Sequence, residues 1–192
     1  QTQADAGADS RATALRQQRG VTVAISNRLH QKLIAAAGGG AMLIATVFLG
    51  GKDGVEGRAY RPYKDVAGVW TVCDGITGAG VIADKRYTDR ECDALLWQRV
   101  RQVKAQVDPL VKVALDEYQR AALYSFAYNV GIRAFARSAL LKKINANDRE
   151  GACEELRRWV YAGGVKRRGL INRREMERSL CLTEVTNDLA TY

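Results

Sequence analysis

Apolar residues recur at helical spacing in the stretch YTDRECDALLWQRVRQVKAQVDP. Thr88 and Glu91 stand in capping-box spacing at its start, and Pro109 ends the pattern. The next stretch, LDEYQRAALYSFAYNVG, is apolar nearly all round and ends at Gly131, a typical residue just beyond a helix. The pattern therefore predicts a central buried helix, preceded by an amphipathic helix with this apolar face: Cys92, Leu95, Leu96, Val100, Val103 and Val107.

The remaining pattern predicts further helices and one small sheet. ARSALLKKIN, REGACEELRRWVYAG and NRREMERSLCL have helical spacing, and another helix is expected to begin near Glu56. In VWTVCDGITGAGVIADKRYT, β-branched and aromatic residues broken by glycines indicate a short β-hairpin. The predicted fold class is α+β and mostly helical, with two lobes and a cleft between them where an extended polymer could lie.

Residues 33–51, LIAAAGGGAMLIATVFLGG, carry no charge and lie between Lys32 and Lys52. As one helix they would rise roughly 28 Å, close to the thickness of a bilayer core. Over half of these residues are Gly or Ala, and the strongly apolar residues supply only about −2 to −4 kcal/mol toward insertion. The segment is long enough to span a membrane, but the membrane would hold it weakly.

Three interpretations of this segment remain open. A cleaved signal peptide lacks a good cleavage site in TVFLGGKDG, and a buried core helix is compatible with the small residues. An uncleaved, weakly held signal-anchor fits the length and flanks best. Lys and Arg are equally numerous near the two ends of the segment. The rule that basic flanks stay in the cytoplasm applies mainly to short tails, so we expect residues 1–31 in the cytoplasm and the chain from residue 53 outside.

Residues 1–31 have the composition of a polar, basic tail, to which no function is assigned. The chain begins at Gln1 and has no methionine before Met42, so we expect its natural start to have been trimmed or altered.

The net charge of +9 indicates a polyanionic partner, which is a nucleic acid, an anionic lipid or an acidic cell-wall polymer. No motif typical of nucleic-acid binding is present. Four cysteines without a CxxC pair, and one distant histidine, His30, argue against a zinc site. The cysteines fit either disulfides or buried thiols, and a location outside the cytoplasm favours disulfides.

The stretch VEGRAYRPYKDVAGVWTVCDGITG places Glu56, Asp65 and Thr71 at separations of eight and five intervening residues. Acidic residues that lie close together in a sequence are usually on the solvated surface of a protein. This spacing, however, resembles the active-site signature of phage-type lysozymes, the muramidase family of T-even and lambdoid phage endolysins. YSFAYNVG, LRRWVYAGG and GLINRREMERSLCL resemble later parts of the same family, and the weak apolar segment resembles signal-anchor-release (SAR) endolysins.

The resemblance implies the two-lobed phage-type lysozyme fold and hydrolysis of the β-1,4 bond between N-acetylmuramic acid and N-acetylglucosamine in peptidoglycan. Glu56 would be the general acid, Asp65 would orient the water, and Thr71 would hydrogen-bond that water. A turn at Arg61-Pro62 is expected to carry Asp65 back across the cleft, roughly 6.5–9.5 Å from Glu56 if the enzyme inverts. We expect no cofactor and no metal, no nucleic-acid partner, and a monomer.

The expected organisation is a tail over residues 1–31, a signal-anchor-release segment over 32–51 and a lysozyme domain over 52–192. Within that domain we expect a β-containing lobe at about 52–88, a connecting helix at about 88–108 and a helical lobe at about 109–192. The protein would be held in the bacterial inner membrane facing the periplasm. Release into the periplasm would let the anchor pack onto the domain and the catalytic helix form.

Further residues are assigned roles by the same resemblance. Tyr128, Asn129 and Ser138 would line the sugar site, although Tyr128 also fits a core position and Asn129 a helix-end cap. Arg173 and Arg174 would support Glu56, or else form a solvated basic face. Many relatives carry histidines where this chain has Asp74 and Ile76. Of three possible cysteine pairings, we expect Cys73 with Cys92 and Cys153 with Cys181.

Three rival functions remain: a non-catalytic, membrane-tethered peptidoglycan-binding module, a cationic membrane-disrupting protein, and a transglycosylase that forms an anhydro-sugar end.

Overall fold

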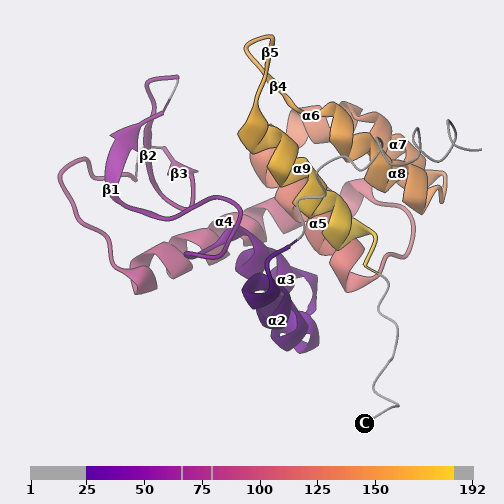
Figure 1. Cartoon of the computed structure of the whole chain (residues 1–192), viewed down its shortest axis with the longest axis horizontal. Helices are drawn as coiled ribbons and strands as arrows, with labels where there is room; N and C mark the ends of the chain where they lie inside the picture. Colours follow the sequence, from indigo (N-terminus) through magenta and orange to yellow (C-terminus); the bar gives the residue numbers. More distant parts are fainter. Residues whose placement is uncertain (1–24, 66, 79, 184–192) are drawn as a thin grey trace, which may run out of the picture.

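The computed structural model describes residues 25–65, 67–78 and 80–183, so most of the expected tail at 1–31 lies outside the described residues. The described chain is mostly helical, with a small sheet at one end of the long helix α4 and a group of helices at the other (Figure 1). This arrangement confirms the predicted α+β, two-lobed fold class.

The small lobe is an antiparallel sheet in the order β1 (Ala59–Lys64), β2 (Trp70–Cys73) and β3 (Ile76–Thr77). The prediction of a turn at Arg61-Pro62 is wrong, because both residues lie within β1 and the chain reverses after Asp65. Proline has no N–H to donate, but β1 is an edge strand, and its pairing with β2 is irregular between Ala59 and Tyr63. A proline is therefore tolerated in this strand.

α4 (Asp89–Val107) is the helix that the apolar periodicity predicts. The Thr88 side chain accepts from the Glu91 N–H and the Glu91 side chain accepts from the Thr88 N–H, which completes the predicted capping box. Pro109 lies in the short 3-10 helix η2 (Asp108–Leu110) that follows. The Cys73–Cys92 disulfide joins β2 to the first turn of α4.

The helical lobe surrounds α5 (Glu117–Val130), which is buried along most of its length and ends at Gly131, as predicted. The Cys153–Cys181 disulfide joins α8 to α9, so both disulfides have the expected pairing. The other elements are α6 (Ile132–Arg137), α7 (Ala139–Asn145), α8 (Arg149–Glu155), η3 (Leu156–Arg158), β4 (Tyr161–Ala162), β5 (Val165–Lys166) and α9 (Arg168–Cys181).

Two features of this lobe differ from the expectation. The helix predicted for REGACEELRRWVYAG ends early, and the last residues of this stretch form β4 and begin the turn to β5. Gly163 and Gly164 both have positive φ, which a two-residue hairpin turn requires, so these glycines favour the turn over a longer helix. The short helix α6 was not anticipated.

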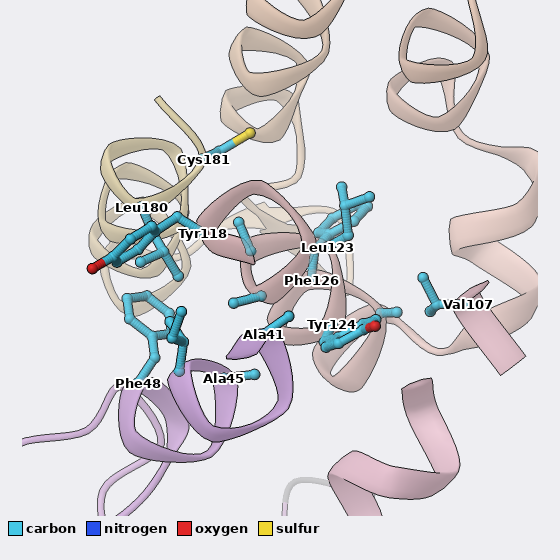
Figure 2. Close-up of a cluster of buried hydrophobic side chains, with 14 of the residues drawn as sticks. Ala41, Ala45, Phe48, Val107, Tyr118, Leu123, Tyr124, Phe126, Leu180 and Cys181 are labelled. Carbon is cyan, nitrogen blue, oxygen red and sulfur yellow. The ribbon is translucent and has the colours of Figure 1, made fainter. Parts of the chain in front are cut away.

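The weakly apolar segment lies against the domain as α2 (Asn27–Ala36), the 3-10 helix η1 (Ala37–Gly39) and α3 (Gly40–Leu49). The helical run therefore begins at Asn27 rather than at Lys32. Asn27–Leu49 is also long and apolar enough to cross a membrane, although part of it is buried within the protein. Figure 2 shows Ala41, Ala45 and Phe48 of α3 in one cluster with side chains of α5 and α9.

The break between α2 and α3 follows from the run of three glycines. Gly40 has a φ of 72°, a conformation that suits glycine. This turn exposes the N-terminus of α3, and the Glu117 carboxylate at the start of α5 accepts a hydrogen bond from the Ala41 N–H. A negative charge at a helix N-terminus is favourable, so Glu117 stabilises α3 in its position on the domain.

Candidate active site

Glu56 lies in the loop directly after α3, so the expectation that a helix begins near it is wrong. The last carbonyl groups of a helix have no partner within the helix. Here, those of Phe48 and Leu49 accept from the N–H groups of Val55 and Glu56, at 2.9 and 3.2 Å. The position of Glu56 therefore depends directly on where α3 ends.

The Glu56 carboxylate is half-buried and pairs with Arg173 of α9, with 2.6 Å between Oε1 and Nη1. Arg173 also donates from Nε to Glu177 at 3.0 Å and from Nη2 to the Ser125 carbonyl at 3.3 Å. Burial disfavours the charged guanidinium, but the charges of Glu177 and Glu56 outweigh this effect and raise the pKa of Arg173. The predicted contact between Arg173 and Glu56 is present.

Arg174 does not take the expected place beside Glu56. Its guanidinium instead pairs with Glu177 and donates to Asn129, and its Nε donates to the Trp159 carbonyl at 3.2 Å. Adjacent residues on a helix point in different directions, so only one of the two arginines can face Glu56 directly. Among the described residues, the hydrogen bonds of Arg174 connect it to Glu56 through Glu177 and Arg173.

Asp65 closes the hairpin between β1 and β2. Its Oδ1 accepts from the N–H groups of Ala67 and Val69, both at 2.9 Å. Among the described residues, no hydrogen-bond partner is present for Oδ2. One carboxylate oxygen therefore fixes the orientation of the side chain and the other can accept from a water molecule.

Thr71 is buried in β2, opposite Tyr63 of β1 and Thr77 of β3. Its hydroxyl donates to the Val69 carbonyl at 3.1 Å. Because the single hydroxyl proton is used in this way, the oxygen is left as an acceptor. Asp65 and Thr71 thus share Val69 as a backbone partner.

The sheet reaches Glu56 through Gly75, in the turn between β2 and β3. A Cβ atom at Gly75 would lie 3.3 Å from Oε2 of Glu56, and Gly75 has a φ of 81°. Glycine allows the turn both its conformation and its close approach to the carboxylate. The sheet that carries Thr71, with Asp65 at its hairpin, is therefore in contact with the Glu56 side chain.

The three residues expected to line the sugar site are placed differently from one another. Tyr128 is half-buried, and its hydroxyl donates to the Asp74 carbonyl at 2.8 Å. Burial and the charges of Glu56 and Asp74 raise the pKa of Tyr128. Asn129 is exposed but engaged by Arg174. Ser138 is buried, its hydroxyl caps α7, and it also lines a pocket with Arg137, Arg158 and Trp159.

A groove beside the small sheet lies between β3 and the exposed face of α4. Most of its lining residues are polar, which suits a polar ligand. It is lined by Ile76, Thr77, Gly80, Leu95, Gln98, Arg99 and Gln102.

Sequence reasoning missed the partners that hold the site together. Glu177 is fully buried and also accepts from the Ser125 hydroxyl at 2.7 Å. Its spacing of four residues from Arg173 and three from Arg174 is a signal that the sequence offers. Arg58 and Asp74, which form a buried ion pair, carry no comparable signal because they lie on different elements.

Comparisons with known proteins agree with the fold. The phage lysozyme family model matches residues 53–177. A SAR-endolysin of bacteriophage PS119 is 51% identical over 163 residues, covering 83% of this chain and 98% of the relative. The active form of the phage P1 endolysin Lyz has a TM-score of 0.67 at 28% identity, covering 82% of this chain and 93% of that one.

A mutant of the phage P22 lysozyme has a TM-score of 0.64 at 30% identity, over 72% of this chain and 95% of that one. The matches thus extend over almost the full length of the relatives. The chain belongs to the phage lysozyme family.

Proposed function

We propose that this chain, a peptidoglycan hydrolase of the phage lysozyme family, uses Glu56 as the general acid and Asp65 with Thr71 to hold the attacking water. The observation that carries the assignment is the environment of Glu56. It is a half-buried carboxylate, ion-paired to Arg173 and in contact with the sheet that bears the other two residues. Two carboxylates in different environments are what glycoside hydrolysis requires.

In the proposed reaction, the bond between the muramic acid anomeric carbon and the glycosidic oxygen breaks. Glu56 gives its proton to the departing oxygen. A water molecule bonds to the anomeric carbon from the opposite face and gives a proton to Asp65. Solvent then returns the protons to their starting places, and the products are two shorter glycan chains.

The hydrogen bonds of Asp65 and Thr71 support this role for the water. Oδ1 of Asp65 is held by its own turn, which leaves Oδ2 to accept one water proton. The Thr71 hydroxyl donates to Val69, which leaves its oxygen to accept the other. With both protons engaged, a lone pair of the water is free to face the anomeric carbon.

The apolar segment extends the proposal to location. The segment around residues 33–51 holds the protein in the inner membrane with the domain in the periplasm, and the released protein has this segment packed as α2 and α3. The helical length and apolar character of Asn27–Leu49 support this, as do the relatives named SAR-endolysins. Peptidoglycan is then the polyanionic partner, and the protein acts as a monomer without nucleic acid.

We also propose the division of the chain into a tail, an anchor and a lysozyme domain with two lobes joined by the helix near 88–108. Since α2 begins at Asn27, the tail ends before this residue. The matches to phage lysozymes and SAR-endolysins give no support to a non-catalytic module or to a transglycosylase.

The experiment is the clearing of outer-membrane-permeabilised cells by the released protein. Glu56→Gln keeps the shape of the side chain but cannot act as an acid, so clearing should fall at least about 100-fold. Glu150→Gln changes an exposed acid on α8 and serves as the control, with clearing expected to stay within about twofold. Unchanged clearing by Glu56→Gln would remove Glu56 from the mechanism.

A further inference from the structure

The proposed mechanism leaves one buried acid without a role. Asp74 is fully buried in the turn between β2 and β3, at a position for which the motif offers no explanation. Its carboxylate accepts from the Gly51 N–H at 3.0 Å and from Nε and Nη2 of Arg58 at 3.1 and 2.7 Å. A buried carboxylate with this many charged and backbone partners is held in one place.

These two partners are the two ends of the loop that carries Glu56. Gly51 begins the loop where the apolar segment ends, and Arg58 closes it just before β1. Asp74 therefore joins both ends at the base of the loop. In addition, the residue after Asp74 is Gly75, which is in contact with the Glu56 carboxylate.

Arg58 and Asp74 also contact other parts of the domain. The Arg58 side chain is only 4% exposed and also pairs with Asp89 and Asp93 of α4, at 2.9 and 2.7 Å. Burial disfavours the charged guanidinium, but hydrogen bonds with Asp74, Asp93 and Asp89 outweigh it and raise the pKa of Arg58. The Asp74 carbonyl accepts from Tyr128 of α5. The loop is thus held to α4 through Arg58 and to α5 through Asp74.

The Gly51 contact depends on the apolar segment. The preceding residue, Gly50, lies against α4 so closely that a Cβ atom would be 2.4 Å from Cδ2 of Leu96. Gly51 follows Gly50 directly, so its place beside Asp74 is set by the packing of the end of α3 against α4. A chain whose residues 33–51 still span a membrane cannot make this contact in the same way.

We propose that Asp74 is a positioning residue. It makes the placement of Glu56 depend on the packing of α2 and α3, which form the former membrane anchor. Asp74 does not touch the substrate in this proposal. It joins Gly51 to Arg58, and this closure holds the intervening Glu56 against Arg173 and the sheet. The inference depends on the proposed role of Glu56 as the general acid.

The first test is Asp74→Asn in the full-length, released protein, with turnover measured on purified peptidoglycan. The amide keeps the size of the side chain and loses the charge that holds Arg58. Misplacing a catalytic group by about 1 Å can cost about 100-fold in rate. We expect kcat to fall by about 10- to 100-fold, with KM within about twofold.

The matched control is Asp93→Asn. Asp93 contacts the same guanidinium, but its side chain is 67% exposed and it has no contact with Gly51. We expect kcat within about twofold of the unmodified protein, because exposed ion pairs contribute little. An equal loss in both variants, or a change in KM alone, would overturn the proposal.

A second variant approaches the same contact from the other side. Gly50→Ala adds the Cβ atom that meets Leu96 and should shift Gly51 away from Asp74. If both variants act on one contact, the double variant should be no slower than Asp74→Asn alone, within about twofold, because coupled effects do not add. Losses that multiply would mean that Asp74 acts independently of the segment, and the coupling would be rejected.

Hydrogen exchange separates local misplacement from general loss of structure. In Asp74→Asn, exchange should rise at the Gly51 and Glu56 amides and stay unchanged in α5 and α9. Faster exchange throughout the protein would assign the loss to stability instead. Activity retained by Glu56→Gln would contradict the proposed catalytic acid itself, a result distinct from any of these outcomes.

Discussion

Two acids and two arginines meet in the interior next to the proposed reaction centre. Glu177 supplies the negative charge that faces both Arg173 and Arg174, and Glu56 accepts a hydrogen bond from Arg173. Glu177 accepts from Nε of Arg173, so that the end of the guanidinium points at Glu56. Glu177 thus pairs with both guanidinium groups, and buried ions are tolerated when they are paired and hydrogen-bonded.

Glu177→Gln removes the negative charge that the two buried guanidinium groups of Arg173 and Arg174 both face. Removing one member of a buried ion pair typically costs about 3–5 kcal/mol, and we expect a loss of stability of this size. Unfolding in urea measures it. Glu154→Gln, which loses surface contacts to Arg157 and Arg178, should cost about 0–1 kcal/mol. Equal stability of the two variants would show that the buried cluster does not need Glu177.

The spacing of the three proposed catalytic residues was visible in the sequence, but the groups that hold them were not. Local motifs such as the Asp65 turn depend on neighbours in the chain. Contacts such as Arg58 with Asp74, or Ser125 with Glu177, join residues from different elements. A single sequence carries no signal for such pairs, so they can be identified only from the folded structure.

Among the elements, those with strong local signals were predicted well. α4 has a capping box and a long apolar face, and α5 has a glycine at its end. β1 was missed because Arg61 and Pro62 suggest a turn, and the β4–β5 hairpin was missed because its strands have two residues each. Short elements depend on tertiary contacts more than on periodicity.

The segment of α2 and α3 shows why one apolar pattern allowed three interpretations. Its residues are apolar enough for a core position, and Ile44, Phe48 and Leu49 are fully buried on the domain. They are also apolar enough for weak insertion into lipid. Hydrophobicity alone does not distinguish burial in protein from burial in a membrane.

Ala35→Leu with Gly38→Leu tests the release of this segment from the membrane. Both positions are exposed in the packed form, and Gly38 has no neighbour within 4 Å of an added Cβ atom. The two leucines add roughly −0.6 to −1.2 kcal/mol to membrane insertion. A larger share of the protein should therefore stay in the membrane fraction after the membrane is depolarised, while the activity of purified, released protein is unchanged.

Glutamine at the same two positions is the matched control, and it should release at least as readily as the unmodified protein. Gly40→Leu is unsuitable, because the positive φ of Gly40 would strain the packed form directly. If the leucine variant partitions like the glutamine variant, membrane affinity does not control release.

For the whole molecule, α4 separates a small sheet from a helical lobe, and the site draws on both (Figure 1). Arg173 comes from the helical lobe, whereas Asp65 and Thr71 come from the sheet. Glu56 lies between them, on a loop that begins where the former anchor ends. The proposed site thus combines a loop and a sheet that are neighbours in sequence with Arg173, which lies 117 residues from Glu56 along the chain.

The most direct test of this account is the origin of the oxygen at the new glycan end. Peptidoglycan is digested in water labelled with oxygen-18, and the released fragments are analysed by mass spectrometry. If Asp65 and Thr71 deliver water to the anomeric carbon while Glu56 protonates the departing oxygen, each new reducing end of N-acetylmuramic acid carries the label, and Glu56→Gln produces almost none. Unlabelled anhydro-sugar ends, or labelled ends formed equally well by Glu56→Gln, would contradict it.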